Sequence, residues 1–390
     1  MAKFENLTYY KLFSSNEGRQ ILAYILANRD LVKLDNHGFW RTKFRVDPNI
    51  TPTDAKGVSA FTVKLREQQQ GELASMRAPL SHSAPLDVEG VKMYTGSIPS
   101  FSPRQFHENA AERWYKQQAF ENLEKTDEDF IFDYAVNAVQ YFVDSGNQTL
   151  SHASAQLLST GRIVVDWGIG NKGNVIDCNV PSENRLTAGT SAWSTADFAL
   201  LDHLRTLVDN LNAKHGEMGW QLEITRTRFI ATFLTNTQVL NWIKLQYAIA
   251  NGVNVSTVPS AVATVDYAVQ ALNSDPTLPR IVIIQEKQND VILGKVKGWA
   301  DDKYAVIRPM GYAGYICHST PIESKVLPTL GAKTIRRVIA SALDGLGIIV
   351  NSELDNGELL EWHSQFIMNA IPTLDEFIYH YIIDTSTADN

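Results

Sequence analysis

The longest regular stretch of the chain has apolar residues that repeat with a helical period. It follows Thr126, a residue suited to cap a helix, and opens with three acidic residues that favour a first helical turn. The continuation FIFDYAVNAVQYFV carries the apolar stripe, and Gly161 stands where a C-terminal cap is expected. The pattern predicts one helix over 127–160, about 50 Å long if Gly146-Asn147 does not interrupt it.

After residue 194, helical and strand-like patterns alternate. Ser194 and Asp197 resemble a cap for a helix whose leucines recur on one face, and Pro259 suits the first turn of a later helix. Helices are predicted at 196–216, 236–252, 257–272 and 333–343, and strands at 228–233 and 280–285. This alternation is typical of an α/β domain, which we expect to end near residue 350.

The first hundred residues carry weaker patterns. Residues 1–56 contain one helical candidate at 17–28 and then an irregular polar stretch with Pro48 and Pro52, which indicates an arm. Residues 57–98 alternate short strand-like pieces such as FTVKL with turn residues. Their apolar content is too low for a core of their own, so we expect a projecting hairpin or a partner-binding loop.

A glycine-rich loop raises the question of nucleotide binding. RIVVDWGIGNKGN, residues 162–174, contains G-x-G-x-x-G, a spacing that cradles a pyrophosphate when it lies between a strand and a helix N-terminus. The next segment, NVIDCNVP, alternates like a second strand. We therefore predict that the glycines close a hairpin and bind no nucleotide.

Two more strands are predicted near the end of the chain. QFIMNAIPTLDEFIYHYII, residues 365–383, is largely apolar and is interrupted at Pro372. The two strands are too short to stand alone, so they must pair with an earlier sheet. The hairpin of residues 162–180 is the most economical partner.

Composition narrows the class of protein. Of the 390 residues, 44% are hydrophobic and 20% are charged, which fits two or three folded domains and excludes a largely disordered chain. The net charge of -8 and the pI of about 5.6 disfavour nucleic-acid binding. Two distant cysteines give no disulfide framework, and neither a secretory leader nor a membrane span is expected. We expect a soluble protein of a reducing cytoplasm.

Residues that could carry chemistry are scattered. The nine histidines show no metal-ligand spacing, and neither a nucleophile elbow nor a Walker-type phosphate loop occurs. Cys317 and His318 are adjacent, and on a strand they would point to opposite faces. The acidic residues 124–129 fit a helix start. We predict no catalytic, cofactor-binding or metal-binding residues and no cofactor, and thus a protein that is not an enzyme.

Two other groups of residues have ordinary structural interpretations. Lys333, Arg336 and Arg337 form a basic patch on the predicted helix at 333–343, which favours a solvated face or a local anion contact. Four tryptophans in apolar or turn-like segments are expected to anchor the core, namely Trp193, Trp220, Trp242 and Trp299. Neither group indicates a nucleic-acid interface.

The order of these elements resembles that of the major capsid proteins of tailed bacteriophages, the Hong Kong 97-type fold, and most closely the branch typified by phage lambda. RAPLSHSAPLDVEGVKMYTGSIPSFSP, residues 77–103, resembles the family's extended E-loop and its return strand. LLSTGRIVVDWG, at the end of the predicted helix, looks like the junction of the family's spine helix with a strand. NAIPTLDEFIYHYI resembles the last strands, which complete the peripheral sheet.

The resemblance implies an α+β fold of five parts that covers nearly the whole chain. A peripheral domain with a long spine helix and a small sheet would carry an inserted axial α/β domain. The parts are an N-terminal arm (1–56), an extended E-loop hairpin (57–98), the peripheral domain with spine helix 127–160 and a hairpin (99–193), the axial domain (194–350) and a return to the peripheral domain (351–390).

The resemblance also implies a structural head protein that self-assembles, as hexamers and pentamers, into the icosahedral shell around the double-stranded DNA of a phage. Assembly in the bacterial host cytoplasm and location in the virion follow. The implied partners are a separate scaffold protein and a portal, with a decoration protein as a further candidate, and no sequence-specific nucleic-acid or membrane binding. Some relatives cross-link a lysine to an asparagine, but Lys56, Lys64 and Lys92 near the E-loop do not match that motif closely.

Two alternatives stay open. One is an encapsulin-like compartment of the same fold, which would enclose cargo instead of a genome. The other is a nucleotide-binding enzyme built on the α/β domain, whose phosphate-binding motif is missing from the sequence.

Overall fold

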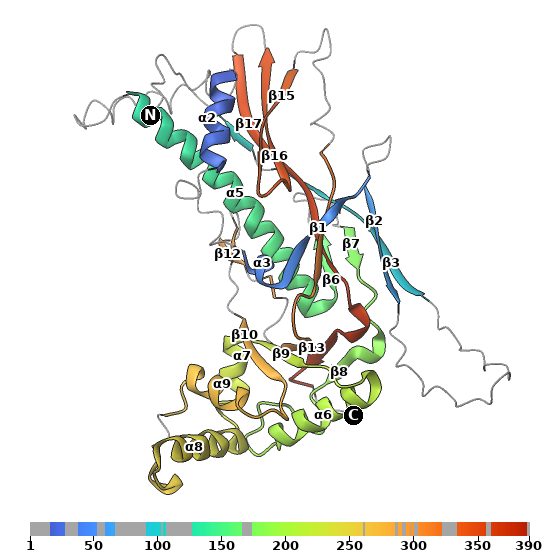
Figure 1. Ribbon diagram of the computed structural model, residues 1–390, viewed down its shortest axis with the longest axis vertical. Coiled ribbons are helices and arrows are strands. Elements are labelled where there is room, and N and C mark those ends of the chain that lie inside the picture. Colours follow the sequence, from blue (N-terminus) through green and yellow to red (C-terminus); the bar gives the residue numbers. More distant parts are fainter. Residues whose placement is uncertain are drawn as a thin grey trace, which may run out of the picture. The chain divides into compact units, whose positions relative to one another are not determined.

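The structure of the chain is a computed structural model. It describes residues 16–27, 38–52, 59–66, 91–102, 104–106, 127–165, 174–259, 262–284, 288–290, 294–296, 298–299, 303–321, 334–355 and 360–387. The chain divides into two compact units, each assembled from separate stretches (Figure 1). The first unit comprises Met1–Phe61, Gly96–Ser154 and Tyr315–Pro372, and the second comprises Thr62–Thr95, Ala155–Gly314 and Thr373–Asn390.

Seven of the described strands form one sheet, which lies almost entirely in the first unit. Its order is β1-β14-β17-β16-β15, and β4 and β5 pair with β17 beside this path. Strands β15, β16 and β17 follow one another as an antiparallel meander. The bounds are β1 (Phe44–Ile50), β4 (Ser100–Phe101), β5 (Arg104–Phe106), β14 (Gly314–His318), β15 (Thr334–Ala342), β16 (Gly347–Asp355) and β17 (Leu360–Leu374).

Three described helices accompany this sheet: α2 (Asn16–Ala27), α3 (Phe39–Lys43) and α5 (Asp127–Thr160). Helix α2 packs against β15 and buries Ile21 and Ile25. Helix α5 confirms the predicted helix over 127–160, and its Phe142 ring stacks on Phe366 of β17 with a centroid distance of 6.3 Å. The apolar stripe of α5 therefore covers the sheet, as the sequence pattern requires.

Two glycines explain how α5 continues and where it ends. A Cβ on Gly146 would lie 2.9 Å from Cδ2 of Leu343 and 3.0 Å from Cε1 of Phe366. Gly146 thus permits close packing instead of interrupting the helix. Gly161 adopts a φ of 71°, and its N–H donates to the carbonyl of Leu157 over 2.8 Å, which confirms the predicted C-terminal cap.

The second unit is built on five described strands in the order β10-β9-β13-β18-β8. Strands β10 and β9 pair in parallel, as do β18 and β8, and the other neighbours are antiparallel. Every residue of β9 is buried, which makes it a central strand. The bounds are β8 (Arg185–Thr187), β9 (Trp220–Thr225), β10 (Arg280–Ile284), β13 (Tyr304–Pro309) and β18 (Tyr381–Asp384).

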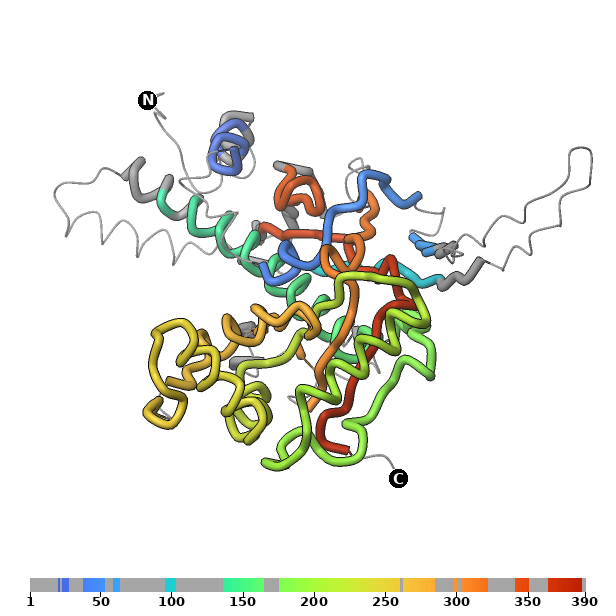
Figure 2. Tube along the Cα trace, turned by 60° about the horizontal axis from the view of Figure 1, so that its bottom comes forward, coloured from blue at the N-terminus to red at the C-terminus, as the bar shows by residue number. Residues whose placement is uncertain are grey.

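Four described α-helices belong to the second unit: α6 (Leu200–His215), α7 (Arg226–Thr232), α8 (Thr237–Asn251) and α9 (Val265–Asn273). They run from green to orange in the trace of Figure 2. Helix α7 packs on β9 and β10, α9 packs on β10, and α8 packs on α6 and α9. The short helical turns are η1 (Ser182–Asn184), η2 (Val255–Thr257) and η5 (Phe377–Tyr379). The predicted helix at 236–252 and the strand at 280–285 are confirmed. The helix expected at 196–216 is also present, but it begins at Leu200 after Ala199, so Ser194 and Asp197 do not cap it as expected.

The described part of the chain also contains three two-stranded sheets. They are β2 (Ala60–Arg66) with β3 (Val91–Ser97), β6 (Arg162–Val165) with β7 (Asn174–Asp177), and β11 (Gln288–Asp290) with β12 (Gly294–Val296).

Four local predictions were wrong. The strand expected at 228–233 is helix α7, whose N-terminus is capped because the Thr225 hydroxyl accepts from the N–H of Arg228. The helix expected at 257–272 begins only at Val265, behind the cap residue Thr264. The helix expected at 333–343 is strand β15, because β16 pairs along its whole length. The stretch taken as irregular is strand β1, where Pro48 is tolerated because β1 lies at the sheet edge.

The end of the chain also differs from the prediction. Strand β17 continues through Pro372, and the second strand, β18, begins only after η5. Strand β17 pairs with β16, and β18 with β13 and β8, whereas the described strands β6 and β7 pair with each other. The hairpin at 162–180 is therefore not their partner. Strands β14, β15 and β16 belong to the seven-stranded sheet, so the α/β sheet does not extend to residue 350.

Candidate assembly sites

Metal-ligating side chains do not gather into a site in the described part of the chain. No three His, Cys, Asp or Glu side chains there are placed to hold a metal ion. Cys317 and His318 lie on β14, where Cys317 is buried and Nε2 of His318 bonds the carbonyl of Asp47 over 2.9 Å. The hydrogen bond of His318 links β14 to its neighbour β1. None of the described helices is both long and apolar enough to cross a membrane.

The glycine-rich loop connects two antiparallel strands, as predicted. Ile163 pairs with Ile176 on a buried face of the β6–β7 hairpin, while Val164 and Val175 face each other on the exposed side. The ion pair of Arg162 with Asp177, 2.7 Å long, closes the end near α5. The loop glycines themselves lie outside the described residues. Val164 and Val175 together form an exposed apolar surface on which another protein surface can pack.

The β2–β3 ribbon corresponds to the two ends of the expected E-loop. Strand β2 contains the predicted FTVKL, and the N–H of Ile98 donates to the carbonyl of Ser59 at the base of the ribbon over 2.8 Å. Lys64 and Lys92 lie on its two strands, whereas Lys56 and the segment 67–90 lie outside the described residues. A two-stranded ribbon is marginally stable alone, so it gains from packing on another surface.

Helix α8 and the turn after it carry an exposed apolar stripe. Ile249 is 67% exposed, and its neighbours Leu245, Val253 and Val255 are also exposed. Leu245 and Ile249 are four residues apart and share one face of the helix. Adjacent exposed apolar side chains are typical of a protein interaction surface.

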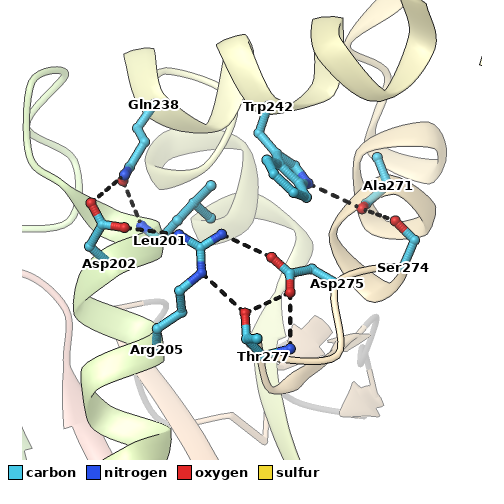
Figure 3. A network of polar contacts seen from close by, with 9 residues as sticks. All are labelled: Leu201, Asp202, Arg205, Gln238, Trp242, Ala271, Ser274, Asp275 and Thr277. Atoms are coloured by element: carbon cyan, nitrogen blue, oxygen red, sulfur yellow. Dashed lines mark hydrogen bonds and ion pairs between the residues drawn. The ribbon is translucent and has the colours of Figure 1, made fainter. Parts of the chain in front are cut away.

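A network of polar side chains fixes α8 to its neighbours (Figure 3). Arg205 of α6 donates to Asp275 and to Thr277 in the turn before β10, over 2.9 and 3.1 Å. The same guanidinium lies 5.7 Å from the ring centre of Trp242 on α8. Burial raises the pKa of Asp275, but hydrogen bonds from Thr277 and Arg205 outweigh it and hold this pKa below its ordinary value. Arg205 thereby links α6 to α8 and to the turn before β10.

A second polar group lies inside the five-stranded sheet. Glu223 of β9 and Arg308 of β13 form an ion pair of 2.9 Å, and both side chains are almost fully buried. Gln221 of β9 donates to the same carboxylate over 2.7 Å. Such a pair is costly to break because it leaves a buried charge uncompensated. No sequence motif had indicated it, since its members are 85 residues apart.

The predicted core tryptophans are mostly confirmed. Trp193, Trp220 and Trp299 are buried, whereas Trp242 is half-buried and contacts Arg205. The expected basic patch is not on a helix, because Arg336 and Arg337 lie on β15 and Lys333 lies outside the described residues.

Comparison with known proteins identifies the fold. No protein-family model and no curated protein matches the sequence. A crystal structure of a prophage protein from E. coli CFT073, assigned as a capsid protein, matches with a TM-score of 0.53 and 12% identity over 94% of this chain and 97% of that one. A phage-related protein from Bordetella bronchiseptica RB50 (TM-score 0.43, 12% identity, 94% and 96% covered) and the procapsid of satellite phage P4 (0.43, 9%, 96% and 99%) are more distant.

The two sheets with their helices define a mixed α+β protein. Over nearly its whole length the chain shares its fold with the prophage protein, so it has the Hong Kong 97-like capsid fold. The fold class expected from the sequence is confirmed.

Proposed function

We propose that this chain is the major capsid protein of a tailed bacteriophage, whose copies assemble into the icosahedral shell around the double-stranded DNA genome. The observation that carries the proposal is the fold shared with the prophage protein over 94% of this chain and 97% of the other. The role is structural and not catalytic. Hexamers and pentamers of the chain would form the shell.

The described surfaces suit such an assembly. A shell subunit needs contacts in several directions, and the chain offers the β2–β3 ribbon, the valine pair of the β6–β7 hairpin and the apolar stripe of α8. We propose that the part of 1–56 before about Gly38 supplies the arm, 57–98 the E-loop and α5 the spine helix, with the second sheet and α6 to α9 as the axial domain. Because each subunit has a net charge of -8, a shell of this chain can enclose DNA without binding its phosphates tightly.

Partners and location follow from the same proposal. The shell would assemble in the bacterial host cytoplasm and persist in the virion. A separate scaffold protein and a portal would be required, and a decoration protein is a further candidate partner.

Electron microscopy of the purified chain tests the proposal. We expect closed shells, curved sheets or rings of six, both from the chain alone and on co-expression with a scaffold protein. Shells filled with a protein cargo would support the encapsulin-like alternative. A small oligomer under every condition, whose melting temperature rises saturably with NAD, ATP or GTP, would contradict the proposal and favour the nucleotide-binding alternative.

A further inference from the structure

The C-terminal end of α5 meets the segment 375–384 at a buried histidine of the second unit. Nε2 of His380 lies 2.7 Å from the carbonyl oxygen of Leu158, and His380 is 2% exposed. A carbonyl oxygen only accepts hydrogen bonds, so Nε2 carries the proton and donates it. The bond satisfies one of the carbonyls that a helix leaves unpaired at its C-terminus.

Two residues around η1 complete this junction. Nη2 of Arg185 donates to the carbonyl of Thr160 over 2.9 Å, and so occupies a second free carbonyl of α5. Nδ2 of Asn184 donates to the carbonyls of Ile378 and His380, over 2.6 and 3.3 Å. Side-chain hydrogen bonds thereby join the end of α5, η1 and the segment 375–384.

Three charged groups on other elements act on His380. They are Arg308 of β13, Glu223 of β9 and Arg185 at the start of β8, all three on strands of the five-stranded sheet. The last turn of α5, Leu157–Thr160, has no charged side chain. A charged imidazole would thus be buried, under the influence of two guanidinium groups and of one carboxylate that already pairs with Arg308.

This environment favours the neutral ring. Burial lowers the pKa of His380 to about 4; the Leu158 bond and Glu223 oppose the shift, and Arg308 and Arg185 add to it. In an open segment exposed to water, the same ring has its ordinary pKa of about 6.5. The open state therefore binds protons more readily, and the closed state loses stability as the pH falls from about 6.5 to about 4.

We propose that His380 is an acid-sensitive latch, which holds the segment 375–384 against the end of α5 while neutral and releases it on protonation. The proton is taken from solvent, and no bond other than hydrogen bonds changes. The latch is a property of the single subunit and does not rest on the capsid function. Acid alone, without a partner, opens it.

Hydrogen exchange of the unassembled full-length chain tests the latch. After correction for the intrinsic rate, peptides covering 375–384 and the end of α5 should lose protection at pH 5 relative to pH 7. The opening equilibrium should rise on the order of twentyfold, from the two pKa values. Peptides covering β16 should keep their protection, because the latch is local. Equal protection of 375–384 at both pH values would overturn the proposal.

Two variants distinguish the protonation of His380 from the protonation of other groups in acid. In His380→Gln the amide can still donate toward Leu158 but cannot be protonated, so the pH response of 375–384 should disappear. The matched control is His318→Gln, since Nε2 of His318 bonds a carbonyl in the same way but the side chain is half-exposed. The control should keep the wild-type response. An unchanged response in His380→Gln would show that another group opens the segment.

A spectroscopic readout covers the case in which His380→Gln fails to fold. In the wild-type chain with labelled histidine, the NMR chemical shifts of His380 should be those of a neutral imidazole down to about pH 5. A His380 signal that titrates near its ordinary pKa while 375–384 remains protected would contradict the latch.

Discussion

The indole Nε1 of Trp40 donates a hydrogen bond of 3.0 Å to Oδ1 of Asn147, in the middle of α5. Both side chains are 1% exposed. Nearby, Arg41 forms an ion pair of 2.7 Å with Asp344 in the turn between β15 and β16. The region expected to be an arm is therefore fixed to the first unit from about Gly38 onward.

Replacing Asn147 by Leu should destabilise the first unit by about 1–3 kcal/mol, because it leaves the buried indole N–H without an acceptor. The measurement is urea unfolding. Trp40→Phe removes the donor of this bond. The free energy of unfolding lost by the double variant should therefore be smaller than the sum of the losses in the two single variants. Strict additivity would mean that this hydrogen bond does not matter for stability.

Replacing Gly314 by Ala should destabilise the second unit by at least about 1 kcal/mol. A Cβ there would lie 1.9 Å from the carbonyl oxygen of Thr373, and backbone cannot move aside cheaply. Gly219→Ala is the matched control. Its Cβ would lie 2.2 Å from Cε of Met310, a 51% exposed flexible side chain that can swing away. Similar melting curves for both variants would refute the argument.

Replacing Arg205 by Met should lower the free energy of unfolding by about 1–3 kcal/mol, since it leaves the nearly buried carboxylate of Asp275 without its cation. The lowered pKa of Asp275 means that its bonds stabilise the fold above about pH 4 and are lost as the pH falls through that lowered pKa. The gap between wild type and variant should therefore shrink in acid. Asp202→Asn, at an exposed partner of Arg205, should change stability by less than about 0.5 kcal/mol.

Replacing Ile249 by Asp should leave the subunit folded and reduce its assembly, because the charge falls on the exposed stripe of α8. Ala250→Asp adds the same charge to an exposed neighbour off the stripe and should assemble normally. Circular dichroism checks the fold, and light scattering with microscopy checks assembly. Normal shells from Ile249→Asp would remove α8 from the proposed contacts.

Deleting residues 71–90, which lie outside the described ones, should leave the second unit folded and abolish closed shells. The reason is compositional, since the expected E-loop has too few large apolar residues to form a core within its own chain. Thermal melting reports on the fold and microscopy on the shells. Closed shells from the shortened chain would mean that the segment is not an assembly element.

The sequence predicts α5 to the residue because all of its signals are local. The acidic first turn, the apolar period and Gly161 act within the helix itself, so no knowledge of the partner is needed. The helix α8 is similar, with Asn236 as its N-cap and the left-handed Gly252 at its end. The β6–β7 hairpin also followed from alternation and a glycine turn.

The errors arise where a distant partner decides the structure. The segment 334–342 has helix-compatible residues but becomes a strand because β16 supplies its ladder. Residues 226–232 look like a strand, yet Thr225 caps a helix there, a local signal that could have been used. The bonds of Trp40 with Asn147, Arg308 with Glu223, and His380 with Leu158 join positions far apart in the sequence. Only the folded chain reveals them.

The position of β18 affects how the chain is made. Residues Tyr381–Asp384 lie between β13 and β8 and follow both in the sequence, so the five-stranded sheet of the second unit lacks one of its middle strands until β18 has been synthesised. Until then β8 has no pairing neighbour among the described strands, and β13 has an open edge that invites premature association. Among the described strands of this sheet β18 comes last in the sequence, so its pairing closes the edges of β13 and β8 together.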